Sequence, residues 1–259
     1  MTDPRIELWF EGQLALLTIR RPEKLNALDA SMVDAFVPLC RQIERSDARV
    51  VILTGEGSAS FCAGGDIAAW SGLGPEAFSR HWLRDGHQAF DAVARLVQPV
   101  IAVLNGQCLG GGLELAACAD YRIAETHVKI GLPETGLGII PGWSGKRLTR
   151  RFGAQVVRRM AIWGEIFPAD GALSLGLVDQ VVPKGQGMAA AQSLALGVSA
   201  RSARATELTK MLINEAEGEE SGRVADALAG AVAAASPELA EGLSAFREKR
   251  KPHFEGDAS

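Results

Sequence analysis

Apolar and polar residues alternate in two short segments near the N-terminus of this 259-residue chain. These segments, at residues 5–10 and 14–19, flank a Glu-Gly pair, and a period of two around a glycine predicts a β-hairpin. Two later runs, 50–55 and 99–106, are apolar without alternation and end in small residues. Unbroken apolar runs of this length are typical of strands that are buried on both faces of a sheet.

Helical periodicity follows in two longer segments. Residues 28–45 repeat apolar positions every three or four residues, and Asp29 or Ser31 is a suitable N-cap. Residues 75–98 show the same spacing, with Gly86 as a candidate interruption. Because these helical segments alternate with the apolar strands along the chain, the pattern predicts an α/β fold.

The second half of the chain is richer in helix. Short strands are expected at residues 121–125, 128–131 and 177–182. Helices dominate beyond residue 145, and from about Met188 the chain is alanine-rich and helical. We therefore expect a core formed by residues 1–187 and a trailing helical subdomain formed by residues 188–259.

Two glycine-rich loops follow the buried strands in the same manner. One reads GEGSASFCAGGDI, residues 55–67, and the other reads GQCLGGGLELA, residues 106–116. If the preceding strands are neighbours in one sheet, both loops lie at the edge where α/β folds bind ligands. Glycine lets backbone N–H groups approach a ligand closely, so the loops are candidates for an oxyanion hole. Neither loop has the glycine spacing of a dinucleotide-binding or triphosphate-binding motif.

Two glutamates lie in or directly after glycine-rich segments. Glu114 follows three glycines near the start of a predicted helix, and Glu134 stands in LPETGLG, residues 132–138. Each has a plain structural explanation, as a first-turn acid favoured by the helix dipole and as a solvated turn acid. Together with an oxyanion hole they supply an acid, a base and donors to an enolate, which is what proton transfer beside a thioester requires.

Composition and charge exclude several classes of function. The formal net charge is −4 and basic residues form only short clusters, so we expect no nucleic-acid partner. The four histidines lack the spacing of a helical zinc pair, so we expect no metal site. No apolar run reaches the ~18 residues of a membrane span and no leader pattern is present, so we expect a cytoplasmic protein without a membrane partner. The four cysteines form no C-x-x-C pair and are expected to be reduced.

With these motifs the sequence resembles the crotonase family, also called the enoyl-CoA hydratase/isomerase superfamily. The resemblance covers nearly the whole chain, in five separated motifs: RPEKLNALD (21–29), SFCAGGDI (60–67), NGQCLGGGLELAACAD (105–120), GLPETGLGIIPG (131–142) and AFREKRKPHF (245–254). It implies a crotonase-like α/β core built as a spiral of repeated ββα units, with a C-terminal helical subdomain that takes part in trimer formation. It also implies that coenzyme A is part of the substrate and that there is no separate cofactor.

The resemblance assigns roles to four residues. The two oxyanion N–H groups of the family match Ala63 and Gly111, and its two hydratase glutamates match Glu114 and Glu134. Retention of both acids favours addition of water to a trans-2-enoyl-CoA, with Glu134 as proton donor and Glu114 as the base that orients water. Two interacting carboxylates titrate as a pair, so this division of roles stays open. An isomerase or hydratase-lyase is the alternative within the family, and a non-catalytic or RNA-associated member is the alternative outside catalysis.

The resemblance also marks candidate contacts to the substrate. Those to the CoA moiety, mostly through the backbone, are Lys24, Asn26, Ala27 and Leu28, with Lys249 matching a family lysine that reaches CoA in a neighbouring subunit. Further candidate substrate-binding residues are Ala63, Gly64, Gly65, Asp66, Ile67, Gly110, Pro133 and Trp143. Family members assemble as trimers or dimers of trimers, so we expect a homo-oligomer that binds an acyl-CoA thioester.

One segment departs from the family pattern. After IIPG, the common hydratase pattern has one small residue and then Gly-Gly-Thr-Gln-Arg-Leu, whereas this chain reads WSGKRL, one residue shorter and with the bulky Trp143. An indole beside the acyl site would narrow it or offer a stacking face to an aromatic acyl group. The plainer interpretation is that Trp143 packs the loop against the following helix. The acyl group, whether straight, branched or aromatic, is therefore left open.

Overall fold

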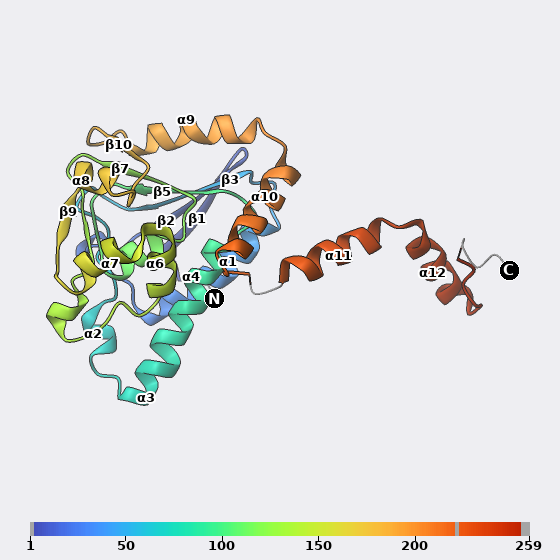
Figure 1. Ribbon diagram of the computed structural model, residues 1–259, viewed down its shortest axis with the longest axis horizontal. Coiled ribbons are helices and arrows are strands. Elements are labelled where there is room, and N and C mark those ends of the chain that lie inside the picture. The colour runs from blue at the N-terminus through green and yellow to red at the C-terminus, as the bar shows by residue number, and fades with distance from the viewer. Residues whose placement is uncertain (1–2, 221–222, 255–259) are drawn as a thin grey trace. The chain divides into compact units, whose positions relative to one another are not determined.

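Two β-sheets form the centre of the computed structural model, which describes residues 3–220 and 223–254 (Figure 1). The strands of the larger sheet are β1 (Ile6–Glu11), β2 (Leu14–Ile19), β3 (Val50–Gly55), β5 (Val100–Leu104), β7 (Tyr121–Glu125) and β10 (Gln180–Val182), adjacent in this order. Those of the smaller sheet are β4 (Ser60–Cys62), β6 (Gln107–Leu109), β8 (Lys129–Gly131) and β9 (Ile166–Pro168), again in this order. The pairs β1–β2 and β8–β9 are antiparallel, and the other pairs are parallel.

Twelve α-helices are present in the described ranges. They are α1 (Ala30–Glu44), α2 (Ile67–Trp70), α3 (Pro75–Ala77), α4 (Arg84–Ala94), α5 (Gly111–Ala116), α6 (Gly145–Phe152), α7 (Ala154–Ala161), α8 (Ala169–Ser174), α9 (Gly187–Ser199), α10 (Ala203–Ala216), α11 (Arg223–Ala235) and α12 (Pro237–Glu248). Short 3₁₀ turns occupy Pro22–Lys24 and Glu134–Leu137, and a π-helix occupies Phe78–Leu83.

Successive strand pairs repeat one arrangement. In β3–β4, β5–β6 and β7–β8, the first strand joins the larger sheet and the second joins the smaller sheet. Helices follow the first two pairs, so the chain winds as the ββα spiral that the family resemblance implied, and the α/β class is confirmed. The sequence pattern did not reveal β4 and β6, because strands of three residues are too short to show a period.

The central strands β3 and β5 of the larger sheet are buried on both faces, which explains their unbroken apolar sequences. Val51 and Leu53 of β3 point into the main core, which also contains buried residues of α1 and α4. Val50 and Ile52 point to the other face and pack with Ala191 of α9. Alternate residues of one strand therefore serve two separate apolar clusters, and the expected burial of the strand is confirmed.

The N-terminal hairpin and the first long helix agree with the pattern. β1 and β2 pair from Ile6 opposite Ile19, and Asp29 is the N-cap of α1, accepting from the N–H of Met32 at 3.2 Å. Ser31, the alternative cap, instead donates its hydroxyl to Asp29 at 2.9 Å.

Three details of the expected elements were wrong. Gly86 does not interrupt its helix but is buried inside α4, where it makes room for the indole of Trp143. The same helix ends at Ala94 rather than continuing to residue 98. The strand expected at 177–182 begins at Gln180, because the N–H of Leu177 closes the end of α8 by donating to Ala172 at 2.9 Å.

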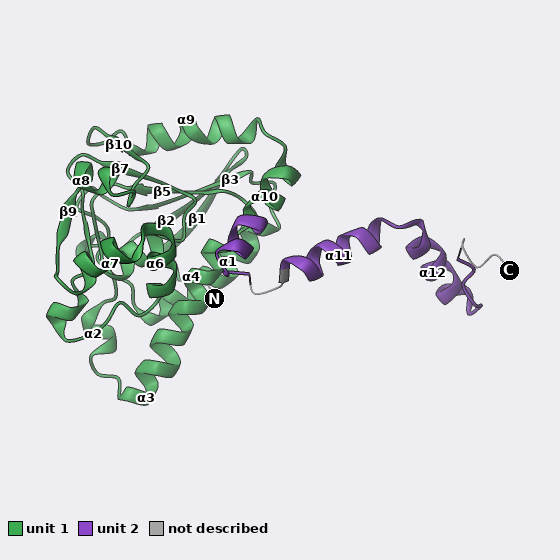
Figure 2. Ribbon diagram, in the orientation of Figure 1, with its two compact units in different colours: residues 1–210 green, residues 211–259 purple. Residues whose placement is uncertain are grey.

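The chain divides into two compact units, Met1–Lys210 and Met211–Ser259 (Figure 2). The first unit continues beyond residue 187, where we expected the core to end, because Ala191 and Ala195 of α9 pack on the larger sheet. Lys210 also belongs to it, since its ammonium group donates to Asp120 at 2.6 Å. The second unit contains α11 and α12, and the last five residues of the expected subdomain lie outside the described part.

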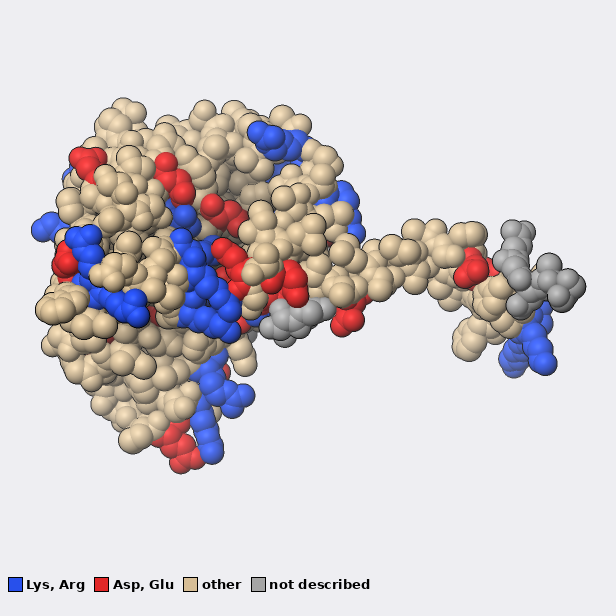
Figure 3. Space-filling model, viewed as in Figure 1, with Lys and Arg blue, Asp and Glu red and all other residues tan. Residues whose placement is uncertain are grey.

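Basic and acidic side chains are interspersed on the face shown in Figure 3. No helix within residues 3–220 and 223–254 has the length and apolarity to cross a bilayer. Within the same ranges, no group of histidine, cysteine or acidic residues is placed to hold a metal ion. The four cysteines are free and buried.

The loop before α1 depends on one buried asparagine. Asn26 is fully buried and, like Leu25, adopts a left-handed backbone conformation that is uncommon outside glycine. Its carboxamide oxygen accepts from the N–H of Arg21, and its nitrogen donates to the carbonyls of Glu56 and Ser60 at 3.0 and 2.7 Å. These bonds join the loop to the chain between β3 and β4.

We expect Asn26→Ala to lower the free energy of unfolding by about 2–4 kcal/mol, because three backbone groups, one buried and two partly buried, lose their partner. Urea denaturation followed by circular dichroism measures the change. Gln192→Ala, which removes an exposed carboxamide on α9, is the matched control and should stay within about 0.5 kcal/mol of wild type. A loss for Asn26→Ala no larger than that of the control would contradict this account of the loop.

Candidate active site

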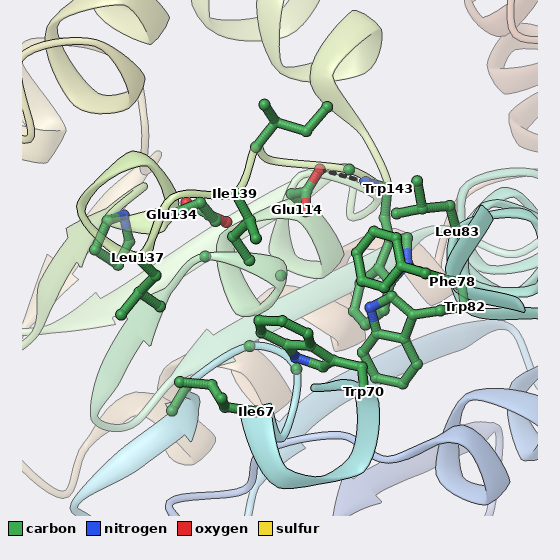
Figure 4. A pocket seen from close by; sticks show the side chains of 18 residues that line it. Ile67, Trp70, Phe78, Trp82, Leu83, Glu114, Glu134, Leu137, Ile139 and Trp143 are labelled. Carbon is green, nitrogen blue, oxygen red and sulfur yellow. Dashed lines mark hydrogen bonds between the residues drawn. The ribbon is translucent and has the colours of Figure 1, made fainter. Parts of the chain in front are cut away.

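A pocket opens where the two glycine-rich loops meet (Figure 4). Its lining contains these residues expected from the sequence: Ala63, Gly64, Gly65, Ile67, Gly110, Gly111, Glu114, Pro133, Glu134 and Trp143. It also contains these residues that were not expected: Trp70, Phe78, Trp82, Leu83, Leu137, Ile139, Ile140 and Gly142. The structure thus brings both glutamates and both loops to one place.

The two loops meet because their strands are neighbours in both sheets. β3 pairs with β5 in the larger sheet, and β4 pairs with β6 in the smaller sheet, with Cys62 beside Cys108. The approach is close enough that a methyl group at Gly112 would overlap the carbonyl oxygen of Cys62. Gly110 is needed for a different reason, since its φ of 54° lies in the left-handed region. The run of glycines in the sequence thus reflects a contact between loops.

Backbone hydrogen bonding corrects one of the expected oxyanion donors. The N–H of Ala63 donates to the carbonyl of Leu25 at 3.1 Å, so it is already used within the protein. Among the described residues, the N–H groups of Gly65 and Gly111 have no such partner. The donor on the first loop is therefore better assigned to Gly65, two residues later, while Ala63 remains part of the lining.

Glu114 is buried on α5, with 2% of its surface exposed. Its Oε1 atom accepts from the N–H groups of Trp143 and Ser144 at 2.8 and 2.5 Å, as the dashed lines in Figure 4 show in part. Burial raises the pKa of this carboxyl to about 7, and these backbone donors oppose the shift without cancelling it. The carboxyl is thus fixed in direction and titrates near neutral pH.

Glu134 starts the 3₁₀ turn after β8 and is 7% exposed. Its Oε2 atom has no hydrogen-bond partner in the described part of the chain, and its other oxygen lies over the Cα of Gly110. Burial raises the pKa of Glu134 to about 7 as well. An unpartnered buried carboxyl oxygen is costly for folding alone, so its position is that of a group that meets a ligand.

The two carboxyl groups face a common gap in Figure 4. Each raises the cost of ionising the other, since the charge of Glu134 also raises the pKa of Glu114. A pair of this kind retains one proton near pH 7, so it offers an acid and a base together.

A second group of contacts holds the backbone that binds Glu114. Arg147 of α6 is buried and donates to the Ser144 hydroxyl at 3.1 Å and to Asp91 of α4 at 2.8 Å. The ion pair ties the start of α6 to α4. The N–H of Ser144 is therefore held in place by α6, although no carboxyl group of this helix lines the pocket.

Trp143 combines both interpretations that the sequence left open. Its ring lines the pocket, yet it is 3% exposed and its Nε1 donates to the carbonyl of Trp82 at 3.0 Å. It packs against Phe90 with ring centroids 5.0 Å apart. The indole thus packs on α4 and the preceding π-helix while its ring lines the pocket.

A family model described as enoyl-CoA hydratase/isomerase matches residues 10–257. The chain belongs to the enoyl-CoA hydratase/isomerase family. A crotonyl-CoA hydratase of Syntrophomonas wolfei is 35% identical over 248 residues, which cover 94% of this chain and 95% of that protein. A short-chain-enoyl-CoA hydratase of Clostridium acetobutylicum is 37% identical over 206 residues, or 79% of this chain and 78% of that protein. The crystal structure of an enoyl-CoA hydratase from Bacillus anthracis is similar with a TM-score of 0.78 and 31% identity, covering 98% of this chain and 100% of that one.

Several positions that match the enoyl-CoA hydratase/isomerase family lie outside the pocket lining. They are Lys24, Asn26, Ala27, Leu28 and Asp66. Asn26 and Leu28 are fully buried, and the backbone of Leu28 is occupied by bonds to Gly64 and Asp66 at 2.8 and 2.7 Å. These bonds join the loop of residues 22–28 to the first glycine-rich loop. The CoA contact that the resemblance implied for this loop stays a prediction.

The other outlying positions are exposed or belong to ion pairs. Asp66 pairs with Arg21 at 2.8 Å and caps α2, while Lys24 is exposed and Ala27 is half-buried. Lys249 belongs to the second compact unit, where it follows α12 in a left-handed conformation. Its expected contact with CoA stays a prediction.

The aromatic side of the pocket was missed by the sequence analysis. Trp70, Phe78 and Trp82 come from α2 and the π-helix, and lie across the gap from the glutamates in Figure 4. The signal in the sequence was three aromatic residues within 70–82, of which Phe78 and Trp82 lie in the segment with helical periodicity. Aromatic side chains at helical spacing are usually core residues, so the pattern alone does not separate the two cases.

The raised pKa values predict a pH-dependent stability. A carboxyl group with a pKa of about 7 in the folded state and about 4.5 in the unfolded state keeps its proton up to a higher pH when the protein is folded. Its stabilising contribution is complete below pH 4.5 and is lost as the pH rises through 7. We expect the free energy of unfolding of Glu134→Gln to rise by about 2–3 kcal/mol relative to that of wild type as the pH increases from 5 to 8, as measured by urea denaturation. Glu11→Gln, an exposed carboxylate on β1, should show no such gain.

Proposed function

We propose that this protein is an enoyl-CoA hydratase, which adds water to a trans-2-enoyl-CoA to give a 3-hydroxyacyl-CoA. The observation that carries the proposal is the pair of buried carboxyl groups, Glu114 and Glu134, in one pocket with the unused N–H groups of Gly65 and Gly111. Two carboxyls that share a proton suit a reaction that both takes a proton from water and gives one to carbon. The names of the relatives support the same reaction.

The proposed reaction balances as a net addition of H and OH across the double bond. The N–H groups of Gly65 and Gly111 donate to the thioester oxygen, which accepts the electron pair of the double bond and becomes an enolate oxygen. The water oxygen bonds to the β-carbon while Glu114 takes the proton that water loses. Glu134, protonated at the start, donates its proton to the α-carbon, and the two carboxyls then re-equilibrate their single proton.

We propose that the CoA moiety lies beside the loop of residues 22–28. The loop is bonded to the first glycine-rich segment through Leu28 and Gly64, so it borders the pocket on the side of Gly65. Lys24 is exposed there and carries the positive charge that a polyphosphate attracts. The whole acyl-CoA is the substrate in this proposal, and no separate cofactor takes part.

The test of the function is a panel of trans-2-enoyl-CoAs of four to twelve carbons, with branched and aromatic members. Loss of the enoyl thioester absorbance reports turnover, and mass spectrometry separates a hydrated product from an isomer or a cleaved one. We expect Glu114→Gln and Glu134→Gln each to lower kcat by about 10²–10⁴-fold, because each removes one acid–base group.

The matched control is Glu11→Gln, which removes a carboxylate outside the pocket and should keep the wild-type rate. The hydratase proposal fails if no member of the panel gains water, or if both pocket variants react as fast as this control. A product of unchanged mass would assign the isomerase reaction instead, and a cleaved product the hydratase-lyase reaction.

We also propose a cytoplasmic homo-oligomer, a trimer or a dimer of trimers, with the C-terminal helices taking part in assembly. Free cysteines suit a reducing compartment, and Trp163, with 77% of its surface exposed, is an apolar side chain that a neighbouring subunit would cover. Light scattering coupled to gel filtration should give the mass of three or six chains. A monomer at micromolar concentration would exclude this assembly.

A further inference from the structure

The indole of Trp143 is a buried part of the pocket lining. Its six-membered ring rests on the backbone of Gly111, since a Cβ added there would lie 2.8 Å from Cζ3. Its backbone N–H binds the carboxyl of Glu114 at 2.8 Å. The indole therefore lies beside Gly111 and Glu114, which flank the reacting carbons in the proposed reaction. An acyl chain that extends past the β-carbon on this side meets the ring.

The indole is held on three sides and has no room to swing away. Its Nε1 donates to the carbonyl of Trp82, and the Trp82 ring packs on it at 4.8 Å between centroids. Phe90, which is fully buried, packs on it from the core. On α4 the ring fills the space over Gly86, where a methyl group would overlap its five-membered ring. The missing side chain of Gly86 thus determines how deeply the indole sits.

We propose that Trp143, seated over Gly86, limits the acyl group to short chains. This inference rests on the proposed hydratase function and names the residue pair that sets its substrate size. Because Phe90 and the core lie directly behind the indole, a smaller side chain at 143 opens space that is continuous with the pocket. A methyl group at 86 acts in the opposite sense, because it pushes the ring off α4 toward the acyl group.

The test compares kcat/KM for trans-2-enoyl-CoAs of four and eight carbons within each variant. Since Trp143 also holds Glu114 through its backbone, a shared loss of rate cancels in this ratio. We expect Trp143→Leu to raise the eight-to-four ratio at least about 10-fold, because each added methylene that finds room contributes several-fold. Gly86→Ala should lower the ratio for six against four carbons. Trp143→Phe, which keeps a ring and perturbs folding less, should give a smaller shift in the direction of Trp143→Leu.

Two matched controls separate pocket size from general damage. Trp9→Leu makes the same exchange at an exposed site on β1 outside the lining, and Gly197→Ala adds a methyl group on α9 with nothing within 4 Å. Both should keep the wild-type ratios. Circular dichroism and thermal unfolding confirm that each compared variant is folded.

An unchanged ratio in Trp143→Leu and Trp143→Phe would overturn the inference, as would a shift of Gly86→Ala toward longer chains. Cinnamoyl-CoA tests the stacking alternative, because a greater loss with this substrate than with the four-carbon one in Trp143→Leu would make the indole a stacking face and also overturn the size limit. These failures differ from failure of the proposed function, in which wild type hydrates no member of the series.

Discussion

The contact between the two glycine-rich loops is the constraint on which the rest of the site depends. Parallel pairing of β3 with β5 and of β4 with β6 brings the backbone at Cys62 against Gly112. The same approach places Gly64 next to Gly111, so that the N–H groups of Gly65 and Gly111 belong to one pocket. A side chain at Gly112 would separate the loops, and the two donors would no longer serve the same oxygen.

Desolvation is what turns two ordinary glutamates into an acid–base pair. Glu114 gains two backbone donors and remains ionisable, whereas the Oε2 atom of Glu134 has no partner in the described ranges. Burial raises both pKa values to about 7, so a proton is available and a base is available at the same pH. Such a pair weakens the fold at neutral pH, which is a common feature of sites selected for chemistry rather than for stability.

Trp143 connects the chemistry of the site to its size. Its backbone orients Glu114, while its ring lies between the pocket and the core at Phe90. The departure from the family pattern therefore falls at a residue whose ring lines the pocket and whose backbone binds the carboxyl group of Glu114. Arg147 of α6 and Asp91 of α4 reinforce the same backbone, so residues outside the pocket lining help to hold the groups that bind Glu114.

Much of the architecture could be predicted from local pattern. Alternation around the Glu-Gly pair, helical spacing after Asp29 and unbroken apolar runs are each produced by short-range geometry and by burial on two faces of a sheet. The strand pattern also predicts that the two glycine-rich loops meet, because parallel strands end at the same edge, and the family resemblance adds both glutamates to that site.

Only the tertiary structure decided which backbone groups and aromatic rings belong to the site. Ala63 donates to Leu25, across a contact between distant segments, so its neighbour Gly65 takes the place expected for it. Gly86 supports a buried indole from another element, which no local propensity records. Hydrogen-bond partners and packing space are properties of residues that meet in three dimensions, whereas the sequence by itself determines periodicity, turn chemistry and the residue types available.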